Sequence, residues 1–111
     1  MDEAEQERLD EFDALNERIQ FFKEKYRDTK YYKLSILLYS DRIILFYCRL
    51  KHLNKNNKYN EIMNNLIERY NSNYTDTQRV CDNAIKKGKY IFFKKYPNLF
   101  YRIMKNKYLK I

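Results

Sequence analysis

Glycine and proline are almost absent from this chain, which contains one residue of each among 111. Hairpin turns and tight loops depend on these residue types, because glycine tolerates positive φ angles and proline presets a turn. The chain is therefore expected to be all-α. Phosphate-binding loops and dinucleotide-binding motifs are excluded, because each needs several glycines to bring backbone N–H groups close to a phosphate. At this length, with 44% apolar residues, one domain with a single core is expected.

Apolar residues recur at steps of three and four along the chain and divide it into helical segments. We predict helices over residues 3–27, 31–54, 59–72 and 76–95. Pro97 then breaks or restarts the chain, because proline suits a first helical position, and a short basic amphipathic helix is predicted there. The segment 31–54 is apolar on nearly all sides, which is typical of the central helix of a bundle. The predicted organisation is an acidic amphipathic N-terminal helix (1–28), a three-helix core (30–95) and a basic, aromatic C-terminal arm (96–111).

Local residue chemistry marks the predicted helix boundaries. Asp28 or Thr29 can cap the second helix. The asparagine-rich stretch 54–58 is expected to be a polar turn, since asparagine tolerates left-handed backbone conformations. Thr75 followed by Gln78 has the form of a capping box, in which each side chain satisfies a backbone N–H group of the first turn. A new helix is therefore predicted to begin there.

The acidic helix carries a narrow apolar stripe. Its members are Leu9, Phe12, Leu15, Ile19, Phe22 and Tyr26. Apolar residues gathered on one face of a helix need to be covered by another element. The stripe either docks on the rest of the domain or pairs with a helix of another chain, and in the second case the protein is a helical interaction module.

The charges are distributed unevenly along the chain. Its net charge is +8. Residues 1–20 hold eight acidic and two basic residues, a net charge of −6, whereas residues 21–111 hold seven acidic and 21 basic residues, a net charge of +14. Regions of opposite charge attract different partners. The two parts of the chain are therefore expected to face different partners.

No membrane span, targeting signal or metal centre is expected. The longest apolar run is interrupted at residues 40–42, so it falls short of the ~20 apolar residues that a bilayer span requires. The acidic start lacks the apolar region of a secretory signal and the Arg-rich, acid-poor composition of a cleaved mitochondrial presequence. Cys48, Cys81 and the single histidine, His52, are too few for a four-ligand zinc site. Reduced, buried thiols are expected instead.

Residues suited to catalysis are not gathered into a pattern. The lone His52 and the scattered carboxylates of the basic region supply no set of nucleophile, base or metal ligands. The protein is therefore expected not to be an enzyme. Residues 84–110 combine lysines with tyrosines and phenylalanines, which is the composition of a surface that binds phosphates and stacks on bases. An RNA-contacting subunit of a ribonucleoprotein, such as a ribosomal particle, is one alternative function.

The order of motifs from residue 42 to residue 95 resembles the LYR-motif family of small mitochondrial helical proteins, and most of all the LYR accessory subunits of respiratory complex I. That family has an aliphatic-Tyr-Arg motif early in one helix, with a leucine and a basic residue about a turn later. An arginine-aromatic pair ends the next helix, and a Thr-Asp cap precedes a third helix that often carries a glycine. The corresponding residues here are Phe46, Tyr47, Arg49, Leu50, Lys51, Arg69, Tyr70, Thr75, Asp76 and Gly88. Cys48 takes the place of the motif's arginine, and Arg49 follows one residue later.

The resemblance implies a three-helix LYR-like bundle with a binding role. LYR proteins bind the mitochondrial acyl carrier protein, whose acidic surface meets basic residues while the acyl chain on its phosphopantetheine enters between the helices. The residues implied in carrier binding are Phe46, Tyr47, Arg49, Lys51, Lys55, Lys58, Arg69 and Tyr70. Taken one by one, the three aromatic residues of this set fit equally well into a core.

The resemblance also implies a place for the protein in the cell. It predicts an accessory or assembly subunit of a mitochondrial complex, with the respiratory chain favoured, on the matrix side and peripheral to the inner membrane. A cytoplasmic location is the alternative. No cofactor is expected on the chain itself, because the acylated phosphopantetheine is carried by the partner.

Overall fold

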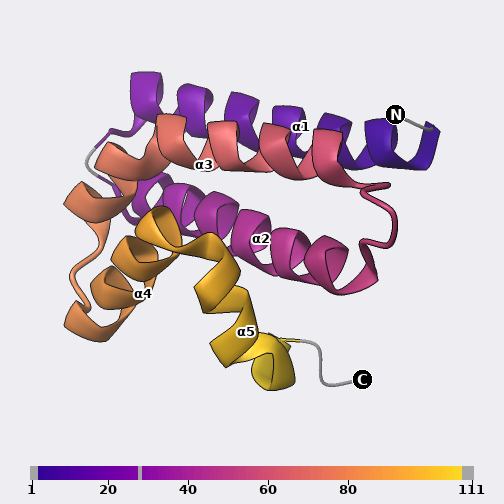
Figure 1. Ribbon diagram of the computed structural model, residues 1–111. Helices are drawn as coiled ribbons and strands as arrows, with labels where there is room; N and C mark the ends of the chain where they lie inside the picture. The colour runs from indigo at the N-terminus through magenta and orange to yellow at the C-terminus, as the bar shows by residue number, and fades with distance from the viewer. Residues whose placement is uncertain (1–2, 28, 109–111) are drawn as a thin grey trace.

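The computed structural model describes residues 3–27 and 29–108, which form five α-helices. In chain order they are α1 (Glu3–Lys25), α2 (Lys30–Leu53), α3 (Asn60–Val80), α4 (Ala84–Lys95) and α5 (Pro97–Tyr108), as Figure 1 shows. No strand occurs within these residues, so the prediction of an all-α fold is confirmed. The last three residues of the predicted C-terminal arm, 109–111, lie outside the described residues.

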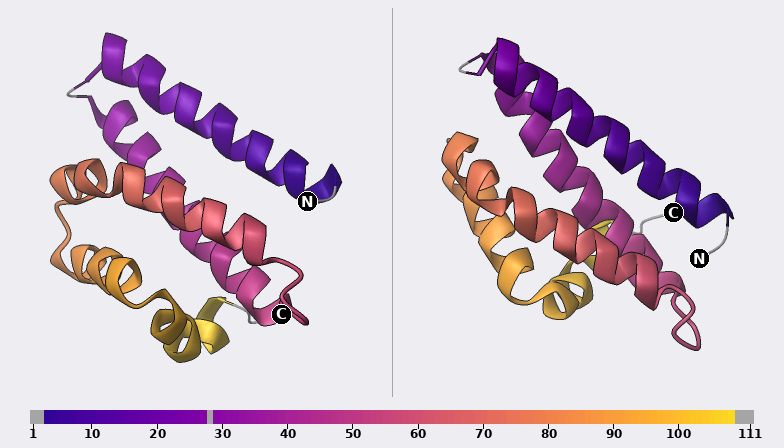
Figure 2. Two further views of the ribbon diagram at one scale, coloured as in Figure 1. Left: turned by 45° about the horizontal axis from the view of Figure 1, so that its top comes forward. Right: turned by 90° about the horizontal axis from the view of Figure 1, so that it is seen from above.

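The central helix of the bundle is α2, as its apolar surface predicted. It contacts α1, α3 and α5, while α4 packs between α3 and α5. In all three views, α2 and α3 lie between α1 and the pair formed by α4 and α5 (Figures 1 and 2). The buried residues of α2 are Tyr32, Ile36, Tyr39, Ser40, Ile43, Ile44, Tyr47, Cys48 and Leu50. The helix is apolar on several sides because neighbours cover it on several sides.

The apolar stripe of α1 docks within the same chain. Leu9, Phe12 and Ile19 are buried, and other members of the stripe are partly buried against the same core. The ring of Phe12 lies 6.0 Å from those of Tyr39 and Phe46 of α2, centroid to centroid. Docking on α2 covers the surface through which an interaction module would pair with a second chain.

Three predicted boundary features are present in the structure. Thr29 caps α2, its side-chain oxygen accepting a hydrogen bond from the Tyr32 backbone N–H at 3.4 Å; Asp28, the alternative cap, lies outside the described residues. Asn56 and Asn57 adopt left-handed conformations, with φ angles of 56° and 61°, in the turn after α2. Pro97 is the first residue of α5, where its missing N–H group costs no helical hydrogen bond.

The predicted capping box at Thr75 is wrong, because α3 continues through this residue to Val80. The break comes later in the chain, and α4 begins at Ala84. Its cap is Asn83, whose side-chain oxygen accepts a hydrogen bond from the backbone N–H of Lys86 at 3.1 Å. The Thr-Asp cap expected from the LYR resemblance therefore does not occur at this position.

The polar end of α3 stays helical because two of its hydroxyl groups bond to backbone carbonyls four residues earlier and one of them is also bonded inside the fold. Ser72 donates to the Glu68 carbonyl at 3.0 Å, and Thr77 donates to the Asn73 carbonyl at 2.8 Å. The Thr77 oxygen also lies 2.7 Å from the hydroxyl of Ser40 on α2, and both residues are fully buried. This tertiary contact outweighs the local preference of serine and threonine for helix ends.

The lone glycine, Gly88, is exposed in α4 and is not required by the packing. A Cβ atom added at Gly88 would meet no atom of the surrounding structure within 4 Å, and its φ angle is not positive. Gly88→Ala is therefore expected to raise the free energy of unfolding by about 1 kcal/mol, because alanine loses less conformational freedom in a helix. Urea denaturation followed by circular dichroism measures this change. A loss of stability would reveal a close contact at Gly88 that the structure does not contain.

Candidate functional site

A groove with an apolar floor and arginines on its rim opens between α1 and α2, and we call it the arginine groove. Its lining residues are Arg8, Glu11, Phe12 and Leu15 of α1 and Arg42, Leu45, Phe46, Arg49, Leu50 and Leu53 of α2. Its volume is about 420 Å³, within the range of about 300–1,000 Å³ that is usual for small-molecule pockets. The residues come from the first half of α1 and the second half of α2, two helices that pack against each other (Figure 2).

Helical spacing gathers these residues on facing stripes. Arg42, Phe46 and Arg49 follow each other at steps of four and three along α2, so they share one face of that helix. The Phe46 ring is partly buried and stacks on Phe12 of α1, with an interplanar angle of 27°. The guanidinium carbon of Arg8 lies 5.8 Å from the centre of the Phe46 ring. The floor of the groove is thus built by contacts that also hold α1 against α2.

The rim of the groove carries an excess of positive charge. Three arginines face one glutamate, Glu11, which pairs with Arg8 at 3.4 Å on the protein surface. Arg42 and Arg49 are exposed, and no other residue of the described chain forms an ion pair or hydrogen bond with either side chain. An anionic group on a ligand can therefore meet two guanidinium groups without displacing an internal partner.

The residues predicted for carrier binding do not form one cluster. Phe46 and Arg49 line the arginine groove. Tyr47 and Tyr70 lie in the core, with exposed fractions of 5% and 0%. Three lysines of the predicted set lie at the end of α2 and in the turn that follows, namely Lys51, Lys55 and Lys58. Arg69 lies on α3, outside the groove lining.

The two core tyrosines each connect separate helices. The Tyr47 hydroxyl donates to the side-chain oxygen of Asn98 on α5 at 3.1 Å, and the Tyr70 hydroxyl donates to the backbone carbonyl of Tyr90 on α4 at 2.8 Å. Both rings meet Phe93 edge-on, at centroid distances of 5.3 and 4.9 Å. Burial raises the pKa of both phenols. These contacts account for both side chains as parts of the core.

Arg69 is already committed to partners on α1 and α3. Its Nη2 atom lies 2.8 Å from the Asp13 carboxylate, and its Nε atom donates to the Asn65 side chain at 2.6 Å. Burial opposes its charge, but hydrogen bonds with Asp13 and Tyr39 outweigh this effect and raise the pKa of the guanidinium. Arg69 lines a polar depression of about 560 Å³ between α1 and α3. There it joins α3 to α1 through Asp13 and to α2 through Tyr39.

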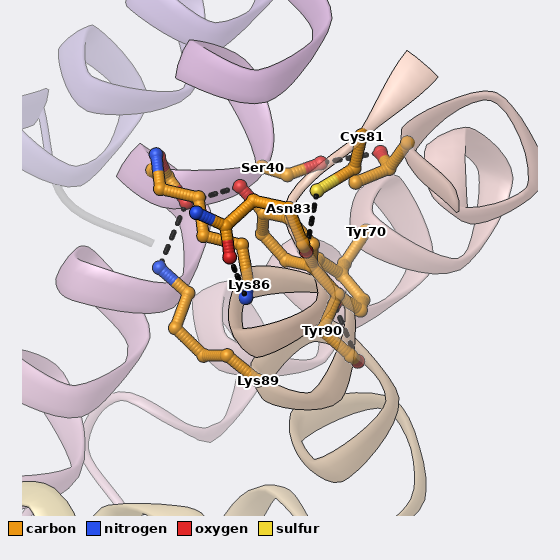
Figure 3. A network of polar contacts seen from close by, with 9 residues as sticks. Ser40, Tyr70, Cys81, Asn83, Lys86, Lys89 and Tyr90 are labelled. Carbon is orange, nitrogen blue, oxygen red and sulfur yellow. Dashed lines mark hydrogen bonds and ion pairs between the residues drawn. The ribbon is translucent and has the colours of Figure 1, made fainter. Parts of the chain in front are cut away.

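A polar network lies where α2, α3 and α4 meet (Figure 3). The Asp41 carboxylate accepts hydrogen bonds from the Tyr90 hydroxyl at 2.7 Å and from the Lys89 ammonium at 3.0 Å. Burial, followed by the bond to Asp41, raises the pKa of Tyr90. Among the described residues, no buried side-chain nitrogen or oxygen lacks a hydrogen-bond partner. The buried polar groups of the network are therefore all bonded within the protein, and their bonds join the helices.

The described part of the chain contains no cluster suited to a metal ion, since no three His, Cys, Asp or Glu side chains come together there. Cys48 and Cys81 are buried free thiols, as predicted. Burial raises the pKa of Cys48 to about 12, which keeps it in the unreactive thiol form at neutral pH. None of the helices in residues 3–27 and 29–108 is both long and apolar enough to cross a bilayer.

Sequence patterns did not single out Arg8 or Arg42. Arg42 and Arg49 lie seven residues apart with apolar residues between them, a spacing that indicates a shared helix face. Arg8 joins them only because α1 docks on α2, which periodicity does not reveal. No family model, curated protein or solved structure matches this chain.

Proposed function

We propose that this protein is a non-enzymatic helical adaptor that binds an acidic acyl carrier protein and receives its apolar chain in the arginine groove. The observation that carries the proposal is the pairing of an apolar floor with exposed Arg42 and Arg49 on the rim, for which residues 3–27 and 29–108 supply no ion-pair or hydrogen-bond partner. Such a site suits an alkyl chain that is attached to an anionic group or carried by an acidic protein. Its favoured form is an accessory or assembly subunit of a mitochondrial complex, within the respiratory chain and on the matrix side.

The apolar floor of the groove supplies affinity for the acyl chain. Each CH₂ group that leaves water is worth about 0.8 kcal/mol, so a saturated acyl chain lying along Leu15, Leu45 and Leu53 gains several kcal/mol. Leu53 is 58% exposed in the unliganded protein. Covering this residue adds to the gain.

The arginine rim supplies orientation and speed of association. Positive surface charge steers an acidic protein toward the groove and raises the association rate, an effect that salt weakens. Lys55 and Lys58 are exposed in the turn after α2 and extend the positive surface beyond Arg49. Arginine also forms bidentate hydrogen bonds with carboxylates and phosphates, which suits both the acidic carrier and its phosphopantetheine.

The LYR resemblance supports the same assignment at two residues. Phe46 and Arg49, which correspond to the family's motif, are the two members of the predicted set that line the arginine groove. In this proposal they act together with Arg8 and Arg42. Tyr47 and Tyr70 belong to the core and, in this proposal, do not touch the partner.

Charge reversal on the rim tests the proposal. The double variant Arg42→Glu with Arg49→Glu is expected to weaken binding of the acylated mitochondrial carrier protein by about tenfold or more at low salt. Isothermal titration calorimetry measures the affinity, and the loss should shrink as salt is added. The matched control is Lys25→Glu with Lys30→Glu, which makes the same change in net charge at exposed positions in the other halves of these two helices.

A second comparison separates the contribution of the acyl chain to binding from that of the carrier protein. The acylated carrier is expected to bind more tightly than the same carrier with a bare phosphopantetheine, because the latter leaves the apolar floor exposed. Equal binding of both forms, or an equal loss in the control variant, would contradict the role of the arginine groove.

A further inference from the structure

The outer surface of α5 is a second feature that the arginine groove does not explain. The inner face of this helix is held by Phe100, which is fully buried and meets Phe92 and Phe93 edge-on, at centroid distances of 5.6 and 5.4 Å. Tyr101 reaches α2, where its hydroxyl lies 3.1 Å from the His52 ring nitrogen. Met104 is partly buried against the same core. These contacts fix which face of α5 points outward.

That outward face carries exposed aliphatic side chains. Leu99 and Ile103 lie one turn apart on α5, with exposed fractions of 46% and 57%, and Tyr96 at the corner before the helix is 59% exposed. Arg102 and Lys105 are exposed beside them. We call these five residues the α5 outer face. It joins apolar side chains, which favour leaving water, to cations on one short helix.

The charge around the α5 outer face has a single sign. Residues 84–108 contain eight lysines and arginines and no aspartate or glutamate. Lys89 pairs with Asp41 of α2, and within the described residues no carboxylate pairs with Lys94, Lys95, Arg102 or Lys105. Phe21, an exposed apolar residue of α1, lies three residues before an acidic residue, Glu24. The region of α4 and α5 is therefore the stronger attractor of anions.

The acidic helix lies on the far side of the molecule. In Figures 1 and 2, α2 and α3 separate α1 from α4 and α5. Within α1, acidic residues outnumber basic ones. An extended anionic surface would attract α4 and α5 more strongly than the α1 side, so this difference in charge orients the whole protein.

We propose that the α5 outer face binds the surface of an anionic phospholipid bilayer. An interfacial helix places apolar side chains at the boundary of headgroups and acyl chains while its cations meet anionic headgroups. Leu99 and Ile103 take the first role, and Arg102 and Lys105 take the second. A nucleic acid fits this surface less well, because Leu99 and Ile103 are aliphatic and only Tyr96, at the corner before the helix, offers a ring on which a base can stack.

The absence of tryptophan from the chain makes a direct test simple. In the full-length variant Ile103→Trp, the single tryptophan is expected to shift its emission to shorter wavelength on addition of vesicles of phosphatidylcholine with phosphatidylserine. Brominated phosphatidylcholine in those vesicles should quench it. The matched control is Phe21→Trp, because Phe21 is 52% exposed on α1 and should show neither change. Vesicles of phosphatidylcholine alone should have little effect on either variant.

The cations are tested separately. Arg102→Gln with Lys105→Gln is expected to reduce vesicle binding by about tenfold at low salt, since each basic residue near an anionic surface contributes to affinity. Lys25→Gln with Lys30→Gln should bind as the unmodified chain does, and circular dichroism verifies the fold of each variant. The proposal is overturned if the Ile103→Trp emission is unchanged, or if Phe21→Trp responds equally. It is also overturned if single-stranded RNA is retained by the chain while anionic vesicles are not.

Discussion

Replacing Tyr70 by alanine is expected to lower the free energy of unfolding by about 3–5 kcal/mol, the usual cost of truncating a large buried aromatic residue. Tyr70 is fully buried, and its ring packs on Phe93 and Tyr74. The cavity would lie where α3 meets α4. Chemical denaturation followed by circular dichroism measures the loss, which is a large fraction of the stability of a domain of this size.

The matched control for this prediction is Tyr70→Phe, which keeps the ring and removes only the hydrogen bond to the Tyr90 carbonyl. Its expected cost is about 1 kcal/mol. The pair of variants also separates two roles for Tyr70. If Tyr70→Ala kept its stability but no longer bound the carrier protein, Tyr70 would be a binding residue, as the LYR resemblance implied. Its assignment to the core would then be wrong.

Raising the pH above the ordinary pKa of thiols and phenols is expected to destabilise the protein steeply. Burial raises the pKa of Cys48 from 9.0 to about 12 and also raises the pKa values of Tyr70 and Tyr90 above 10.0. The unfolded chain therefore releases these protons at lower pH than the folded chain. Since the unfolded state then binds fewer protons, stability is complete below about pH 9 and falls as pH rises, by up to about 1.4 kcal/mol per pH unit for each group.

Two observations at a series of alkaline pH values measure this effect. Exposed tyrosines such as Tyr31 and Tyr96 should ionise while the helices are intact. The remaining rise in phenolate absorbance should accompany the fall in helix content seen by circular dichroism, because the buried tyrosines ionise only when the fold opens. Cys48→Ala should make the decline between pH 9 and pH 10 shallower, since the thiol titrates before the phenols. A gradual ionisation of all twelve tyrosines with the helices intact would contradict the prediction.

The binding predictions depend on which side chains the fold leaves exposed. Phe46 and Arg49 were identified from motif order, and they line the arginine groove. Arg69 was identified in the same way, yet its guanidinium group forms an ion pair with Asp13 of α1. A motif records the spacing of residues along one chain segment. Whether a cation remains available to a partner depends on which carboxylate another helix brings to it.

The end of α3 shows the same limit for helix boundaries. Thr75 has the local chemistry of a cap, and the residues around it are polar. The helix nevertheless runs on to Val80, because the buried contact between Thr77 and Ser40 is made only when α3 is longer. Local preferences of a few tenths of a kcal/mol per residue yield to such tertiary contacts.

The sequence by itself determined the helical class, the central position of α2, the asparagine turn and the start of α5 at Pro97. These features follow from backbone freedom and from the period of apolar residues, which are properties of neighbouring positions along the chain. Tertiary structure alone decided that α1 docks in cis, that Tyr47 and Tyr70 belong to the core, and that Arg8 and Arg42 meet Arg49 at one groove. Those outcomes depend on which helix faces are brought together, and packing between distant segments sets that pairing.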